Sequence, residues 1–177
     1  MTHLNVEIKA RCNDPDLVRN YLKEHNAEFK GTDHQTDTYF NVSQGRLKLR
    51  EGNIENNLIF YHRADRAEAK ESHFQLVKVA DSAALKKVLS ESLGIKAVVE
   101  KKREIYFIAN VKFHIDEVKS LGNFAEIEAS NLYQNMPKEE LQKQCNFYLR
   151  ELKIQQPDLI AASYSDMLLE KSGNCLS

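Results

Sequence analysis

The 177-residue sequence lacks the features that would assign the chain to a membrane or to the cell exterior. No stretch approaches the roughly 18 consecutive apolar residues that span a bilayer. The opening residues, Met1 to Asn5, lack the basic segment and the apolar stretch of a signal peptide. Cys12, Cys145 and Cys175 are widely spaced and odd in number, which favours neither a disulfide framework nor a zinc site. We therefore expect a cytoplasmic protein with reduced thiols and no membrane partner.

The sequence also has no large excess of positive or negative charge. The chain has 25 lysines and arginines against 26 aspartates and glutamates, a net charge of −1. Proteins that coat nucleic acid are strongly basic, so we expect no nucleic-acid partner. The H-E-x-x-H, P-loop, G-x-S-x-G and G-x-G-x-x-G motifs are absent too, so the chemistry associated with each has no support. If the charges have a function, it must come from their local arrangement.

The sequence does contain segments in which apolar and polar residues alternate as in a β-strand, with charged residues on one face. Residues 4–11 alternate strictly between apolar and polar, and residues 46–50 place three cations on one side and two leucines on the other. Further strands are predicted at 36–42, 57–63, 72–79, 97–108, 111–117 and 124–129. Helices are predicted at 14–26, 82–93, 137–152 and 163–171. This order indicates one α+β domain over 1–171, followed by a disordered tail at 172–177.

The charged strand faces are predicted to point inward. For any one strand, a solvent-facing sheet surface is the simplest interpretation. The pattern recurs in most strands, however, and three amphipathic helices also need apolar surface to pack on. Helices that cover the apolar face leave the charged face inside, and a closed sheet of about eight strands has room there for side chains or one small ligand. We predict a closed, mainly antiparallel, eight-stranded β-barrel with its helices packed outside.

Cations outnumber acids in the predicted interior. The candidate cations are Lys9, Arg11, Arg46, Lys48, Arg50, Arg63, Lys78, Lys101 and Arg103. The candidate anions are Glu7, Asp37, Asp116, Glu126 and Glu128. Unpaired charges at low dielectric cost several kcal/mol per ion, and a polyanionic ligand would relieve that cost.

The acids suggest a metal site beside these cations. Glu126 and Glu128 are two residues apart on one strand, so their side chains point to the same side. Carboxylates so arranged suit Mg²⁺ or Mn²⁺. Together with Glu7 and Asp116 they could form a metal pocket next to the cations, which is the arrangement that phosphoryl transfer requires.

Several motifs resemble those of the CYTH, or triphosphate tunnel metalloenzyme, superfamily over nearly the whole chain. Residues 5–9, Asn-Val-Glu-Ile-Lys, are similar to its E-x-E-x-K signature. Residues 114–128 are similar to the HxDEVxxLGxFxExE block of the class IV adenylyl cyclase-like branch, and 35–40, 46–50, 98–103 and 163–166 resemble further family segments. The first signature glutamate is Asn5 here. An amide oxygen can ligate a cation but adds no charge, so a second metal would bind weakly or not at all.

The resemblance implies a metal-dependent enzyme that acts on a triphosphate in a charged tunnel. The residues expected to bind the triphosphate are Lys9, Arg46, Lys48, Arg50, Arg63, Lys78, Lys101 and Arg103. Those expected to hold Mg²⁺ or Mn²⁺ are Glu7, Asp116, Glu126 and Glu128. Lys9 and Glu7 are the candidate catalytic residues.

The sequence alone leaves several interpretations of the function open. The chain is most similar to class IV adenylyl cyclases, which convert ATP to cyclic AMP and pyrophosphate. A similar tunnel would serve a triphosphatase for tripolyphosphate, thiamine triphosphate or a nucleotide. A non-catalytic polyphosphate or nucleotide binder is a third reading, motivated by Asn5, and a structural domain with solvent-facing charges is a fourth. The expected partner is a small-molecule triphosphate, and a homodimer is left open.

Overall fold

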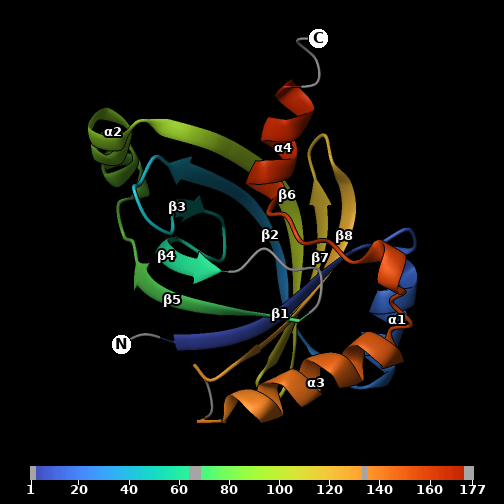
Figure 1. Cartoon of the computed structure of the whole chain (residues 1–177). Coiled ribbons are helices and arrows are strands. Elements are labelled where there is room, and N and C mark those ends of the chain that lie inside the picture. The colour runs from blue at the N-terminus through green and yellow to red at the C-terminus, as the bar shows by residue number, and fades with distance from the viewer. Residues whose placement is uncertain (1–2, 64–68, 133–134, 174–177) are drawn as a thin grey trace.

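The computed structural model describes residues 3–63, 69–132 and 135–173, which form a β-barrel with helices outside it (Figure 1). The strands are β1 (His3–Arg11), β2 (Glu28–Phe40), β3 (Arg46–Glu51), β4 (Asn57–Arg63), β5 (Lys70–Lys78), β6 (Ile95–Ile108), β7 (Val111–Val118) and β8 (Gly122–Ser130). The helices are α1 (Pro15–Glu24), α2 (Ser82–Leu93), α3 (Lys138–Glu151) and α4 (Tyr164–Gly173), with a 3₁₀ turn at Gln156–Asp158. None of these helices is long and apolar enough to cross a bilayer.

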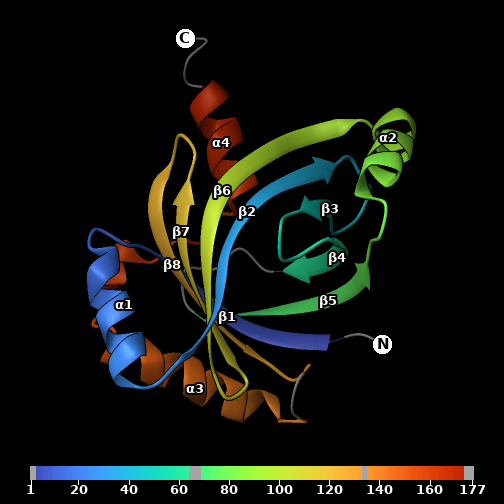
Figure 2. The same cartoon turned by 180° about the vertical axis from the view of Figure 1, so that it is seen from behind.

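The sheet closes on itself in the order β1-β5-β4-β3-β2-β6-β7-β8, and every neighbouring pair is antiparallel. Helices α1 and α3 lie outside the barrel on one side, and α2 and α4 lie toward the opposite end (Figures 1 and 2). The predicted closed eight-stranded barrel is therefore confirmed.

The apolar strand faces point outward, toward the helices. Alternate residues of β1, β7 and β8 pack against α1 and α3 in a core that includes Val6, Ile8, Val111, Phe113, Ile127, Leu22, Leu141 and Cys145. Burial of these side chains removes apolar surface from water on the outside of the barrel. The polar residues between them consequently face the interior, as the charge pattern predicted.

Some element boundaries differ from the sequence-based prediction. β2 begins at Glu28 rather than at residue 36, and a register shift near Gly31, whose φ is 124°, breaks the alternation in this segment. Helix α1 ends at Glu24 rather than at residue 26. Helix α4 includes Ser172 and Gly173, two residues predicted to be disordered, and the rest of that tail, 174–177, lies outside the described residues. The predicted domain boundary at 171 remains a prediction.

Candidate functional site

A cavity of about 820 Å³ lies inside the barrel. Among the described residues that line it, eight are basic and five are acidic, so its walls carry an excess of positive charge. The predicted site residues that line it are Glu7, Lys9, Lys48, Arg50, Lys78, Lys101, Arg103, Glu126 and Glu128. The barrel thus brings together side chains from β1, β3, β5, β6 and β8 that are distant in the sequence.

Other predicted interior residues lie elsewhere. Arg46 donates a 2.8 Å hydrogen bond to Asp166 at the start of α4 and is not part of the cavity wall. Arg11 is exposed at the end of β1, with its guanidinium 5.5 Å from the centre of the Phe124 ring, and it is not part of the cavity wall. The side chain of Arg63 lies outside what the structure describes.

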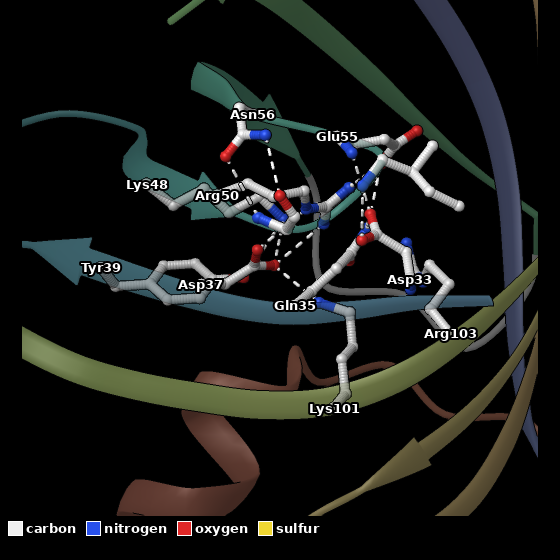
Figure 3. A network of polar contacts seen from close by, with 12 residues as sticks. Asp33, Gln35, Asp37, Tyr39, Lys48, Arg50, Glu55, Asn56, Lys101 and Arg103 are labelled. Carbon is white, nitrogen blue, oxygen red and sulfur yellow. Dashed lines mark hydrogen bonds and ion pairs between the residues drawn. The ribbon is translucent and has the colours of Figure 1, made fainter. Parts of the chain in front are cut away.

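Asp37 gathers three cations around one carboxylate (Figure 3). It accepts hydrogen bonds from Arg50 Nε at 2.8 Å and Nη2 at 2.9 Å, from Lys101 Nζ at 2.8 Å and from Lys48 Nζ at 3.2 Å. Burial favours protonation of Asp37, but the three cations outweigh it and hold the pKa of this carboxyl well below its usual range. Arg50 also donates a 2.8 Å hydrogen bond to Glu55, so two carboxylates face three cations and this part of the wall keeps a positive excess.

Burial disfavours the charged form of Lys101. Its side chain is buried, and burial together with Arg50, Arg103 and Lys48 lowers its pKa to about 7 despite the neighbouring Asp37. A cation so destabilised gains most from an added anion, because the anion restores the charge balance that burial removed. An added anion near Lys101 would therefore favour its charged form.

Asp116 orients Arg103 from behind the cavity wall. Arg103 Nε donates to Asp116 Oδ1 at 2.7 Å, and Tyr164 donates its hydroxyl proton to Asp116 Oδ2 at 2.7 Å. Burial would raise the pKa of Asp116, but Arg103 keeps it low. Asp116 is engaged by Arg103 and Tyr164 and is not part of the cavity wall, and its predicted role as a metal ligand remains a prediction.

Glu126 connects three neighbouring groups within the wall. It lies 3.3 Å from Lys9 Nζ and accepts a 2.9 Å hydrogen bond from Arg103 Nη2. His114 Nδ1 lies 3.1 Å from Glu126 Oε2, and burial and Arg103 lower the His114 pKa to about 3. The imidazole is therefore neutral at pH 7, and Nδ1 donates its proton to the ionised carboxylate. Lys9 Nζ also lies 3.8 Å from the centre of the Tyr164 ring.

A group of oxygen atoms on β1 and β8 fits a hard divalent cation. Glu7 and Glu128 are cross-strand partners, and Asn5 lies one inward position before Glu7. Burial raises the pKa of Glu128, with further contributions from Glu7, Glu126 and Glu55 against Lys112. The buried Asn5 Oδ1 has no hydrogen-bond partner within the described part of the chain.

The described residues include no cluster of three His, Cys, Asp or Glu side chains already gathered around one point. The donor types nevertheless suit Mg²⁺ or Mn²⁺, because these ions prefer carboxylate and amide oxygens and because a cation would relieve the repulsion at Glu128.

Asp33 fixes the connection between β3 and β4, a feature that the sequence pattern did not reveal. It is fully buried, and its carboxylate accepts backbone N–H groups from Ile54 at 2.9 Å and Glu55 at 3.0 Å (Figure 3). Gln35 Nε2 donates to Asp33 at 2.7 Å and to Glu55 at 3.1 Å. The turn residues are therefore tied to β2, and Glu55 is held at the cavity wall.

Gly52 is required by this close approach, so Gly52→Ala should destabilise the protein. A Cβ at this position would lie 2.5 Å from Asp33 Oδ1 and 2.9 Å from its Cγ. Overpacking of this kind costs about 1–3 kcal/mol, which for a chain of this size corresponds to a fall of roughly 2–12 °C in the melting temperature. Gly173→Ala is the control, since its Cβ would meet nothing within 4 Å. Equal melting temperatures for both variants and the unaltered protein would show that the Asp33 contact is not constraining.

Comparisons with known proteins agree on the architecture. A model of the CYTH domain family matches residues 3–164. A protein of Methanocaldococcus jannaschii, provisionally named an adenylate cyclase, is 27% identical over 173 residues, which cover 93% of this chain and 98% of that protein. A solved structure from Pyrococcus horikoshii is 23% identical with a TM-score of 0.80, and the match covers 92% of this chain and 98% of that one.

A further solved structure bears a description of activity. It is a Hippeastrum protein, provisionally named an adenylyl cyclase, that has a dominant triphosphatase activity. It is 16% identical to this chain with a TM-score of 0.63, and the match covers 97% of this chain and 96% of that one. At this identity the similarity shows a shared fold.

Proposed function

The chain belongs to the CYTH domain family, and on that premise we propose that it is a divalent-metal-dependent enzyme that acts on a small-molecule triphosphate inside the barrel. The observation that carries the proposal is the cluster of Lys48, Arg50 and Lys101 around the single carboxylate of Asp37. Such buried, incompletely neutralised cations are costly to the free protein. A triphosphate in the cavity would supply the missing negative charge.

The proposed binding surface runs along the inward faces of β1, β3 and β6. Arg50 and Arg103 are fixed in orientation by Asp37 and Asp116, so their remaining N–H groups are presented in a defined geometry. Lys9, Lys48 and Lys101 add compact charges along the same wall, and Lys78 lies on β5. Donors fixed before the ligand arrives stabilise the charge that develops on phosphoryl oxygens without reorganisation, which is the largest effect that such a site can supply.

Asn5, Glu7 and Glu128 would hold the divalent cation. When bound, Mg²⁺ or Mn²⁺ supplies Lewis-acid stabilisation of charge on the phosphate oxygens. Glu126 keeps Lys9 and Arg103 in place through its own contacts, and we assign it to positioning as well as to the acidic wall. We assign Lys9, held beside Glu126 and over Tyr164, to orienting the reacting group.

Two reactions fit this site. We favour the cyclase reaction, in which the 3′-hydroxyl of ATP attacks the α-phosphorus and pyrophosphate leaves, because the M. jannaschii relative with an adenylate cyclase name matches nearly the whole chain. The second reaction is hydrolysis, in which water attacks the terminal phosphorus and orthophosphate leaves. The dominant triphosphatase activity of the Hippeastrum protein supports this alternative.

Product analysis tests the proposal and separates the two reactions. Purified protein is incubated with Mg²⁺ or Mn²⁺ and, separately, with ATP, tripolyphosphate or thiamine triphosphate. Cyclic AMP with pyrophosphate identifies a cyclase, and orthophosphate identifies a triphosphatase. Saturable triphosphate binding without any product in either metal would overturn the enzyme assignment in favour of a binding protein.

The described cysteines fit the cytoplasm, where we place the enzyme. Cys12 and Cys145 are free and buried, and burial raises the pKa of both thiols, that of Cys145 to about 12. Thiols of this kind are unreactive and suit a reducing compartment. Homodimerisation remains a prediction.

A further inference from the structure

Glu55 already pairs with two of the cations that line the cavity. Its carboxylate accepts a 2.8 Å hydrogen bond from Arg50 Nη1 and forms an ion pair with Lys112 Nζ. Burial would favour the neutral acid, but these two cations hold the Glu55 pKa far below its usual range. The carboxylate is therefore ionised at any physiological pH and acts as an internal anion at the cavity wall.

The position of Glu55 places this anion at one rim of the barrel. Arg50 and Asn57 form the last cross-strand pair before the turn that contains Glu55. Lys112 is the second residue of β7, directly after the turn from β6. Because Glu55 contacts both Arg50 on β3 and Lys112 on β7, it crosses the space between two strands that are not neighbours in the barrel.

The backbone of Glu55 is fixed, and its carboxylate is held by contacts with Arg50, Lys112 and Gln35. Asp33 accepts the N–H groups of both Ile54 and Glu55, and the Asn56 side chain donates to the Gly52 carbonyl at 2.8 Å. The turn therefore cannot swing away as a unit without breaking several hydrogen bonds. Only rotation about the side-chain bonds of Glu55 can withdraw its carboxylate from Arg50 and Lys112.

We infer that Glu55 competes with the phosphate chain for Arg50 and Lys112 and thereby limits the affinity of the site for triphosphates. This inference rests on the proposed function, because it takes the cavity to be the triphosphate site. A phosphate oxygen can take the Arg50 Nη1–H that Glu55 now accepts only if the carboxylate leaves, because the two anions repel each other at short range. The loss of the Glu55 contacts weakens binding relative to a site without the carboxylate.

Calorimetric titration of tripolyphosphate into the unaltered protein and into Glu55→Gln tests the inference. The amide keeps the size of the side chain but removes its charge, so the dissociation constant should fall by about tenfold or more, which corresponds to the loss of one close like-charge interaction. Glu51→Gln is the control, because Glu51 pairs with Lys86 in the same part of the chain and does not line the cavity. Its dissociation constant should stay within about twofold of the unaltered value.

The outcomes separate this inference from the proposed function. Weaker or unchanged binding by Glu55→Gln, with clear binding by the unaltered protein, would overturn the inference, and weaker binding would show that Glu55 positions Arg50 instead. Absence of binding by both proteins would overturn the proposed function as well.

If Glu55→Gln does not fold, the crystal structure of the unaltered protein with tripolyphosphate tests the inference instead. We expect Glu55 to be out of hydrogen-bonding distance of Arg50 Nη1, and a carboxylate still bonded to both cations would contradict the inference.

Discussion

Asp37→Asn is expected to lower the melting temperature by roughly 10 °C in the absence of ligand. The substitution removes the single carboxylate that Arg50, Lys48 and Lys101 share, and it leaves these cations in a buried site. Removal of one partner from a buried ion pair costs about 3–5 kcal/mol, and each kcal/mol corresponds to about 2–4 °C in a protein of this size. Thermal unfolding followed by circular dichroism measures the effect.

The same variant should regain stability when tripolyphosphate is added. The cations that have lost the Asp37 charge attract the ligand more strongly, so saturating tripolyphosphate should raise its melting temperature by more than it raises that of the unaltered protein. Asp16→Asn is the control, because Asp16 pairs with Arg19 on the surface and should shift the melting temperature by no more than about 2–4 °C. If Asp37→Asn were destabilised but gained nothing from tripolyphosphate, the cation cluster would be structural and not a ligand site.

Glu128→Gln is expected to reduce metal-dependent turnover by about 10³-fold, because the proposed metal loses a charged ligand and metal assistance is worth several kcal/mol. The fold should be unaffected or slightly stabilised. The reason is that burial and neighbouring acids raise the Glu128 pKa in the folded chain, so the ionised form is the costly one at pH 7. Turnover, metal affinity and melting temperature are measured on the same preparation.

Glu117→Gln is the matched control for Glu128→Gln. Glu117 lies on the neighbouring strand β7, but its side chain is exposed on the outside of the barrel. Turnover of this variant should stay within about twofold of the unaltered value, as for most surface substitutions. Retention of full metal-dependent turnover by Glu128→Gln would remove Glu128 from the proposed metal site.

The sequence was sufficient to predict the barrel because alternation of apolar and charged residues is a local property. Residues 4–11 and 46–50 show it directly, and the amphipathic helices indicated which face would be covered. The inward placement of Lys9, Lys101 and Glu126 followed from parity on their strands. The beginning of β2 was missed because it is held by pairing with β6 across an irregular register, and such pairing is not visible in the segment itself.

The alternation of residues along a strand could not show which inward-facing side chains reach the cavity and which pair with residues outside it. Arg46 and Asp116 have the predicted parity, yet the first pairs with Asp166 of α4 and the second holds Arg103 and Tyr164. Asp166 and Tyr164 come from a helix more than forty residues further along the chain. Glu55 was missed because turn residues carry no periodicity, and its position depends on a buried hydrogen bond to Asp33.

The central claim is that the inward face of the barrel, and not its outer surface, binds a triphosphate, and two adjacent lysines on β6 test it directly. Lys101 is buried at the cavity wall, and Lys102 is exposed on the opposite face. Tripolyphosphate binding is measured by calorimetry at pH 6, below the Lys101 pKa of about 7, where this side chain is charged. We expect Lys101→Met to weaken binding by about 10–100-fold and Lys102→Met to leave it within about twofold. Equal effects of the two substitutions, or a larger effect of Lys102→Met, would contradict a triphosphate site inside the barrel.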